Sequence, residues 1–359
     1  MNSLIFHCEL QARRQYRLGE PIEITFELRN VSDDIYRVLT WDIPIEGRAL
    51  NFLSVSYEGS NLLYDGPLIK RGDPTQERYI TLRPGESRSA EVDISKLYAI
   101  QAPGEYVLTV ACALSDAYPV ADDGSPSTRA RASHEPRELE RASVTITVEA
   151  GDPPRMTLGQ QARMAELREL PSEEAREAYY PILQGGNTVE RERTRDAHWH
   201  AVTKVNQAVQ HLEASGPASG KYREWFGANV PLFPEITSGL TTFTVTLNNF
   251  KLIQSIMSFP TFLPQTYILQ PVGELCNSET FAYTYSGTTK VWLCLLYWFA
   301  PLYGAPDTKY GTLVHEWSHA IASTEDYAVG VDSCRALAIS KPKQAVYNAD
   351  SYEYFVEYL

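Results

Sequence analysis

The chain has 359 residues, which predicts two domains or one large one. Its 43% hydrophobic and 21% charged residues are typical of a folded protein rather than a disordered, collagen-like or coiled-coil chain. The 45 acidic and 32 basic residues give a net charge of −13, which argues against nucleic acid as a partner because phosphate binding needs a basic surface. The longest apolar run, Val291 to Ala300, is about half of the ~20 residues that a membrane helix needs, so no membrane partner is expected.

The cysteines and the first residues leave the cellular compartment open. Cysteines stand at positions 8, 112, 276, 294 and 334 and form no CxxC pair, so neither a zinc ribbon nor a thioredoxin motif is predicted. The first ten residues lack a basic region followed by an apolar stretch, and we expect no signal peptide within this chain.

Residues 10–148 alternate short β-rich runs with turn residues. The runs are Ile22–Leu28, Arg37–Trp41, Leu53–Tyr57, Tyr79–Leu82, Ser89–Ile94, Tyr106–Ala113 and Ser143–Val148. Strands of this length and spacing predict an all-β, immunoglobulin-like sandwich over residues 1–150. Tyr106 follows a turn and starts a strand; it is either a tyrosine corner or a surface turn residue, and the sequence does not decide between them.

Two polar segments interrupt this pattern. Residues 115–141 are rich in Asp, Ser, Pro and Arg and are expected to form a long mobile loop before the last strand. Residues 151–186 are expected to be an interdomain linker and activation region. Within it the pattern predicts a short helix over 158–170 and a second helix that Ser172 caps.

From Asn187 onward the pattern becomes helical and predicts an α+β domain over residues 187–359. Apolar residues recur at helical spacing from Val189 to Ala214. An aromatic hairpin follows over Phe281–Tyr285 and Val291–Trp298, and another helix is expected to begin near Asp307.

That last helix carries His315, Glu316 and His319 in an HExxH motif. Residues four apart share one face of a helix, so both imidazoles can reach one Zn²⁺. Glu316 then lies beside the metal, where it can take a proton from the zinc-bound water and pass it to a leaving amine. The alternative, two surface histidines, is disfavoured because the flanking residues are apolar and predict a buried helix.

A catalytic zinc needs a third protein ligand and an open fourth position. The nearest acidic residues after the helix are Glu325 and Asp326, and the spacing alone leaves both open.

Several stretches resemble one family, the aspzincins, which comprise deuterolysins and peptidyl-Lys metalloendopeptidases. The similar stretches are GTLVHEWSH at 311–319, TEDYAVG at 324–330, YREWFG at 222–227, FAYTY at 281–285 with Cys294, and NADSYEYF at 348–355. The resemblance covers residues 187–359. It implies a zincin-like metalloprotease domain with one Zn²⁺ held by His315, His319 and Asp326, and Glu316 as the catalytic residue.

The chain departs from the family at two places. The interval from His319 to Asp326 is shorter than in fungal members, a deletion expected to be harmless. Val329 replaces the family tyrosine that is expected to hydrogen-bond the oxyanion, a donor whose loss can cost roughly 10²-fold in rate. The resemblance therefore implies reduced activity, natural or introduced, or a substitute donor such as Tyr327.

In the family, the positions of Asp350 and Glu353 line the pocket for the residue after the cut. Two carboxylates facing one pocket select a cation, so cleavage before Lys, with Arg as a second choice, is expected. The alternative is a solvated acidic C-terminus. Cys276 and Cys294 match paired family cysteines, which implies a disulfide and hence secretion or periplasmic export. The other three cysteines are expected to be buried or free thiols.

The N-terminal sandwich resembles the propeptide of bacterial family members, which inhibits its own enzyme. An inhibitor of a lysine-selecting enzyme should offer a lysine, and we expect Lys70, in the turn-rich segment 66–72, to enter the Asp350/Glu353 pocket. The alternative is an ordinary basic hairpin tip. No lysine occurs between Lys96 and Lys204, so maturation in the linker needs cleavage at an arginine or a second protease.

These features together predict a secreted zinc metalloendopeptidase zymogen that acts on protein or peptide substrates. Its parts are a propeptide domain (1–150) that binds intramolecularly, a linker (151–186) and a catalytic domain (187–359). The alternative is a catalytically silent zinc-binding protein that serves as a binding module, and Val329 is the feature that favours it.

Overall fold

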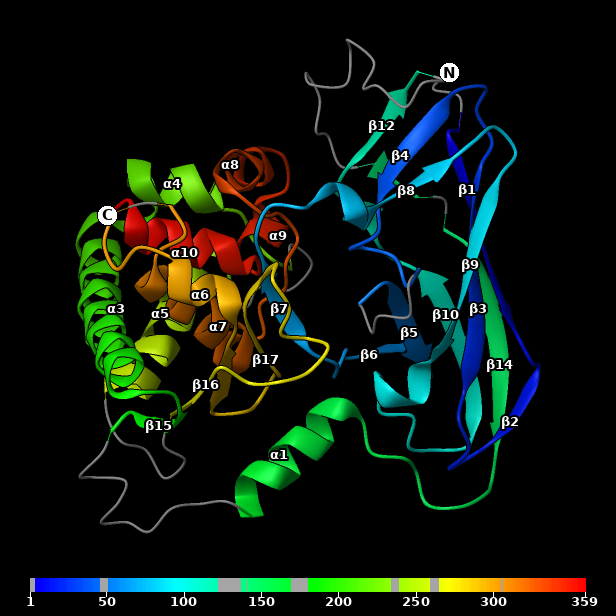
Figure 1. Ribbon diagram of the computed structural model, residues 1–359, viewed down its shortest axis with the longest axis horizontal. Coiled ribbons are helices and arrows are strands. Elements are labelled where there is room, and N and C mark those ends of the chain that lie inside the picture. The colour runs from blue at the N-terminus through cyan, green and yellow to red at the C-terminus, as the bar shows by residue number, and fades with distance from the viewer. Residues whose placement is uncertain are drawn as a thin grey trace. The chain divides into compact units, whose positions relative to one another are not determined.

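The computed structural model describes residues 4–45, 51–121, 137–139, 141–168, 180–233, 239–258, 265–304 and 306–359 (Figure 1). The chain divides into two compact units. The first contains residues 1–67 and 74–161, and the second contains residues 68–73 and 162–359. A short segment from the first half of the sequence therefore belongs to the second unit, which no boundary drawn along the sequence anticipated.

The described part of the first unit is built mainly from strands. Its sheets have the orders β1-β3-β9, β2-β14-β10-β5-β6, β12-β4-β8 and β11-β13, and all neighbours are antiparallel except β2 and β14. The strands are β1 (Phe6–Ala12), β2 (Gln15–Arg17), β3 (Glu23–Asn30), β4 (Ile35–Leu39), β5 (Leu53–Tyr57), β6 (Ser60–Leu62), β8 (Tyr79–Leu82), β9 (Ser87–Asp93), β10 (Gly104–Val110), β11 (Ala113–Leu114), β12 (Ala117–Val120), β13 (Arg137–Glu138) and β14 (Ser143–Glu149).

Alternating side chains from the β1-β3-β9 sheet and from the five-stranded sheet share one core. Phe26 of β3 and Leu108 of β10 are fully buried in the same cluster, as the two-residue period of a strand requires. Tyr106 is also buried, and its hydroxyl donates to the carbonyl of Ala102 at 2.8 Å. The surface-turn interpretation of Tyr106 is therefore wrong, while the immunoglobulin-like assignment stays a prediction.

The two polar segments contain more regular structure than expected. The predicted loop over 115–141 includes β12 and β13, while its residues 122–136 and 140 lie outside the described part. The predicted helix near 158–170 is confirmed as α1 (Leu158–Arg168), and the second helix, after Ser172, lies outside the described residues. The predicted linker also ends earlier than residue 186, because β15 (Ile182–Gly185) is part of a sheet.

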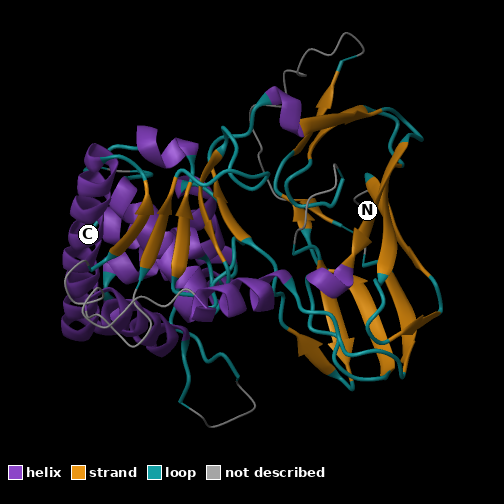
Figure 2. Cartoon of the chain, turned by 60° about the horizontal axis from the view of Figure 1, so that its bottom comes forward, coloured by secondary structure: helices purple, strands orange, loops and turns teal. Residues whose placement is uncertain are grey.

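The second unit has a mixed sheet with the order β15-β16-β18-β17-β7 (Figure 2). Its other strands are β16 (Thr266–Leu269), β17 (Thr280–Thr284), β18 (Lys290–Leu293) and β7 (Leu68–Arg71). The first three strands are parallel, whereas β17 and β7 are antiparallel to their neighbours. The segment around Lys70, predicted as a turn, is thus the edge strand β7.

Helices pack beside this sheet. They are α3 (Thr188–Ser215), α4 (Gly220–Phe226), α5 (Thr242–Ser258), α6 (Leu295–Phe299), α7 (Lys309–Ala322), α8 (Val331–Ser340), α9 (Pro342–Ala345) and α10 (Ala349–Glu357). The predicted hairpin ends at Leu293, after which α6 follows. The disulfide between Cys276 and Cys294 is present. Among the described helices, none has the length and apolar character to cross a membrane.

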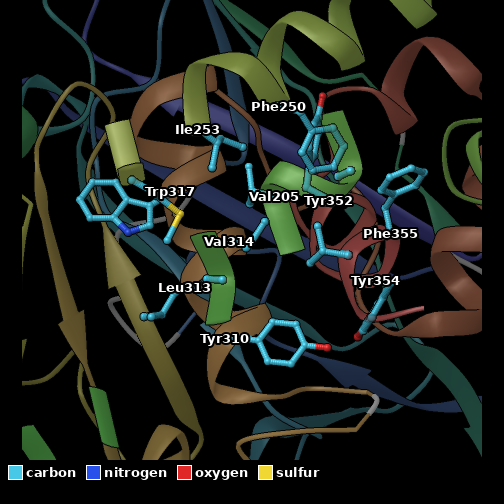
Figure 3. Packing of buried hydrophobic residues seen from close by; sticks show 14 of the residues in the cluster. Val205, Phe250, Ile253, Tyr310, Leu313, Val314, Trp317, Tyr352, Tyr354 and Phe355 are labelled. Atoms are coloured by element: carbon cyan, nitrogen blue, oxygen red, sulfur yellow. The ribbon is translucent and has the colours of Figure 1, made fainter. Parts of the chain in front are cut away.

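Helix α7 lies in the middle of the second unit and is buried along almost its whole length. Thr308 caps it by accepting a hydrogen bond from the Gly311 amide. Its apolar side chains Leu313, Val314 and Trp317 pack with residues of α3, α5 and α10 (Figure 3). The polar residues of the HExxH motif are therefore carried into the interior, where each needs a partner.

Candidate metal centre and cation pocket

Helix α7 brings the two histidines of the motif together. His315 and His319 lie one turn apart, and their Nε2 atoms are 3.0 Å from each other. The side chains are 1% and 0% exposed. Two buried nitrogens that face each other this closely point to a shared ligand, because two imidazole lone pairs would repel.

The loop after α7 supplies a carboxylate to the same point. Ser323 adopts a left-handed conformation with φ of 53° that ends the helix, and Glu325 then pairs with Asn348 in a parallel bridge. This pairing places Asp326 Oδ1 3.3 Å from the Nε2 atoms of both His315 and His319. Of the two acidic residues, the structure thus brings Asp326 to the histidines. The backbone of Glu325 forms the bridge with Asn348.

The three atoms have the spacing that a tetrahedral zinc ion requires. Zinc–ligand bonds of roughly 2.0–2.1 Å at tetrahedral angles separate neighbouring ligand atoms by about 3.3 Å. The distances of 3.0, 3.3 and 3.3 Å among His315, His319 and Asp326 agree with this value. The Asp326 side chain is 24% exposed, so the centre is open on that side and a fourth ligand can enter.

The Nδ1 atom of each histidine also faces an oxygen atom of the protein. His319 Nδ1 donates to the carbonyl oxygen of Thr324 at 2.8 Å. This leaves the lone pair of its Nε2 available to bind a metal. His315 Nδ1 lies 2.8 Å from Asp350 Oδ1 and 3.4 Å from Glu353 Oε2. Carboxylates at this position orient a metal-binding imidazole and raise its basicity.

Glu316 is fully buried beside the histidines. Neither of its carboxylate oxygens has a hydrogen-bond partner among the described residues, which is rare for a buried acid. Burial raises the pKa of Glu316 to about 7, although the neighbouring His315 and His319 rings act to lower it. A buried carboxyl group with a pKa near neutrality can both accept and return a proton.

A second cluster, which we call the cation pocket, lies on the other side of His315. It consists of Asp307, Asp350 and Glu353, and the ammonium of Lys70 sits among them. Lys70 Nζ is 2.7 Å from Glu353 Oε2, 3.1 Å from Asp307 Oδ1 and 3.5 Å from Asp350 Oδ1. Burial alone would lower the pKa of Lys70, but the three carboxylates raise it well above its usual range.

This arrangement bears on the alternatives that the sequence left open. Asp350 and Glu353 are 1% and 0% exposed and do not form a solvated surface. Lys70, whose side chain is 2% exposed, is not at an exposed hairpin tip. His315, Asp350 and Glu353 also have metal-like spacing, but the lysine ammonium already supplies the positive charge there.

Position 329, where the sequence predicted that a valine replaces a family tyrosine, is exposed. Val329 lies on the loop between Asp326 and α8, and 46% of its surface is exposed. Tyr327 on the same loop is 42% exposed; burial of its hydroxyl and the nearby Glu325 carboxylate both raise its pKa. The geometry therefore gives Tyr327 a partner in Glu325.

Sequence reasoning missed Asn348 and Asp307, which both shape this centre. Asn348 accepts from the Ala328 amide at 2.8 Å, and Asp350 accepts from the Gly330 amide at 2.8 Å, so the start of α10 holds the loop that follows Asp326. Asp307, the third carboxylate of the cation pocket, had no motif to mark it. Asn348 stood in the NADSYEYF stretch and could have been recognised there.

Comparison with known proteins agrees with this geometry. Residues 211–357 match the family model described as lysine-specific metallo-endopeptidase. An extracellular protease of Aeromonas hydrophila is 28% identical over 94% of this chain and 88% of its own length. The peptidyl-Lys metalloendopeptidase of Pleurotus ostreatus is 32% identical over 44% of this chain and 84% of its own length. Among solved structures, a zinc peptidase from Grifola frondosa is 31% identical over 48% of this chain and 96% of its own, with a TM-score of 0.40.

The match to the family model spans the HExxH helix, Asp326 and the start of α10. The match to the Aeromonas protease extends over both units. The chain therefore belongs to the aspzincin family of metalloendopeptidases.

Proposed function

We propose that this chain is the proenzyme of a secreted zinc endopeptidase that cleaves peptide bonds before lysine. One observation carries the proposal: Asp350 lies 2.8 Å from His315 Nδ1 and 3.5 Å from Lys70 Nζ. A site for a cationic side chain is thus one residue away from the metal ligands. The extracellular relative from Aeromonas supports secretion.

The residues at the centre would have different roles in peptide hydrolysis. One zinc ion on His315, His319 and Asp326 would polarise the scissile carbonyl and lower the pKa of the attacking water. Glu316, whose buried carboxylate oxygens have no hydrogen-bond partner in the described part of the chain, would take the proton of that water and pass it to the leaving amine. Its pKa of about 7 suits both transfers.

The cation pocket supplies the preference for the residue after the cut. A lysine side chain of the substrate would place its ammonium where Lys70 Nζ lies, against Glu353 and Asp350. Because these carboxylates are buried, an uncharged side chain would leave their charge uncompensated, which is strongly unfavourable. This penalty is the physical basis for the proposed lysine preference.

Latency follows from the way β7 joins the sheet. It pairs antiparallel with β17, with Lys70 opposite Ala282, and extends the sheet at its edge as a bound peptide strand does. Removing β7 would expose the edge of β17 and empty the cation pocket together. Residues 68–73, which the sequence joins to the first unit at both ends, therefore act as an intramolecular inhibitor, with Lys70 as the inhibitory residue.

The test uses the full chain and a matured form, made from it by proteolysis in the region 162–186 and removal of the N-terminal fragment that carries β7. We expect about one zinc per chain by elemental analysis, and cleavage of peptide libraries before lysine after maturation. The variant Glu316→Ala should keep the zinc and lose the activity. Cleavage without any basic preference at this position would overturn the proposed specificity, and a zinc-loaded, matured form that cuts nothing would overturn the proposed reaction.

Val329 favours a second candidate function, a zinc-binding protein that does not cleave. The valine has no hydrogen-bond donor, and an oxyanion donor is worth roughly 10²–10³ in rate. We propose Tyr327 as the substitute donor, which would have to turn from Glu325 toward the substrate. If Tyr327→Phe leaves the rate of the matured enzyme unchanged, Tyr327 is not that donor.

A further inference from the structure

Three carboxylates, rather than the two expected from the sequence, surround the lysine ammonium in the cation pocket. Asp307 Oδ1 lies 3.1 Å from Lys70 Nζ, which is closer than Asp350 Oδ1 at 3.5 Å. We infer that Asp307 is a specificity-determining residue that makes the pocket select lysine over arginine. The inference rests on the proposed function, because it assumes that a substrate side chain enters where Lys70 does.

The backbone around Asp307 is held firmly in place. Asp307 has φ of 59°, a left-handed conformation that aspartate tolerates better than most residues. Its amide donates to Glu357 Oε2 at 3.2 Å, and the amide and hydroxyl of Thr308 both donate to Glu357 Oε1 at 2.7 Å. Since Thr308 caps α7, the helix with the metal ligands also sets the position of Asp307.

The Asp307 carboxylate is oriented as well as positioned. The hydroxyl of Tyr354, the neighbour of Glu353 on α10, donates to Asp307 Oδ1 at 3.3 Å. The same oxygen faces Lys70 Nζ. A short side chain on a fixed backbone, with a hydrogen bond to its charged oxygen, has little freedom to move away from the cation.

Exposure separates Asp307 from the other two carboxylates. Its side chain is 39% exposed, whereas those of Asp350 and Glu353 are 1% and 0% exposed. Asp307 therefore forms the solvent-facing side of the ammonium site, while Asp350 and Glu353 form its buried side. The Phe281 ring, with its centroid 5.3 Å from Lys70 Nζ, lines a further side.

This geometry fits an ammonium group better than a guanidinium. An ammonium is a compact charge with three N–H donors that spread in three directions, and three carboxylate oxygens receive them here. A guanidinium is planar and directs its five donors within one plane. Arginine would therefore direct fewer donors toward the three carboxylates than lysine does, and would depend less on Asp307.

The first test measures the coupling between Asp307 and Lys70 in the full chain, with Glu316→Ala added to prevent self-cleavage. Denaturation midpoints are compared for Asp307→Asn, Lys70→Met and the double variant. We expect Asp307→Asn to lower the midpoint when Lys70 is present and to raise it with Lys70→Met, because the three carboxylates then repel one another. The same shift in both backgrounds would overturn the inference.

The second test measures specificity in the enzyme matured from the full chain. Peptides differ only in Lys, Arg or norleucine after the cut. For Asp307→Asn we expect kcat/KM on the Lys peptide to fall about tenfold, mostly through KM, and the Arg peptide to change less than about threefold. The matched control Asp332→Asn, whose side chain is fully exposed on α8, should leave the Lys/Arg ratio unchanged.

The outcomes separate this inference from the proposed function. If the unaltered enzyme does not prefer Lys to norleucine, the proposed pocket fails and the inference fails with it. If the enzyme prefers Lys and Glu353→Gln removes that preference, but Asp307→Asn keeps the Lys/Arg ratio, the pocket stands and Asp307 has no role in specificity.

Discussion

The metal centre and the cation pocket share His315 but are assembled in different ways. The centre uses Nε2 of His315 with two residues that lie within eleven positions along the sequence, so one helix and the following loop build it. The pocket lies at Nδ1, and its parts come from β7, the segment before α7, and α10; Lys70 and Asp350 are 280 positions apart along the sequence. Local spacing thus brings the candidate metal ligands near one another, whereas only tertiary packing assembles the cation pocket.

The largest expected effect tests which acid completes the metal centre. Asp326→Ala should reduce zinc affinity and activity by on the order of 10³-fold or more, because it removes one of three ligands. The matched change at the neighbouring position, Glu325→Ala, keeps the backbone bridge to Asn348 and should retain the zinc. Elemental analysis after dialysis checks both variants, and zinc loss from Glu325→Ala alone would reverse the assignment.

The next effect concerns latency. In the full chain, Lys70→Ala leaves buried Asp350 and Glu353 without their cation, a loss that costs about 3–5 kcal/mol and would weaken inhibition by roughly 10²–10⁴-fold. A cut in the linker alone should not release activity, since β7 stays paired with β17. Both expectations are checked by the residual peptidase activity of the full chain, cut and uncut, with and without Lys70→Ala. An unaltered cut form with full activity would contradict the inhibitory role of β7.

A gain of activity is expected at the loop beside the centre. Val329→Tyr restores a hydroxyl donor and should raise kcat by about 10²-fold, with little change in KM, because the bond forms mainly in the transition state. Val329→Phe, which adds the ring without the hydroxyl, is the control. Equal rates for the two variants would show that position 329 does not donate to the oxyanion.

The smallest effect separates the two sites directly. Asp350→Asn should lower zinc affinity by about 10–100-fold and also weaken lysine binding, because Asp350 contacts both His315 and the cation. Glu353→Gln should weaken lysine binding with a smaller change in zinc affinity, since its oxygen is nearer to Lys70 at 2.7 Å than to His315 at 3.4 Å. Zinc titrations beside peptide kinetics check this, and identical zinc affinities would mean that Asp350 does not support the metal centre.

Much of the fold could be predicted from local pattern. The strands near Leu53–Tyr57 and Tyr79–Leu82 and helix α3 appear where periodicity placed them. The segment around Lys70 was predicted as a turn because Gly66-Pro67 and Gly72 enclose it. The segment is a strand because it pairs with the edge of β17. Since β17 is far away in the sequence, a local pattern could not predict this pairing.

The sequence by itself determined the histidine pair of the candidate metal centre, because a helical turn brings His315 and His319 together wherever that helix lies. Only the tertiary structure decided where Asp307 stands, how Asn348 and Asp350 hold the loop after Asp326, and that segment 68–73 belongs to the second unit. The physical reason is distance along the chain. Helix geometry relates residues within a few positions, whereas the burial of charges against one another relates residues that no repeat or spacing connects.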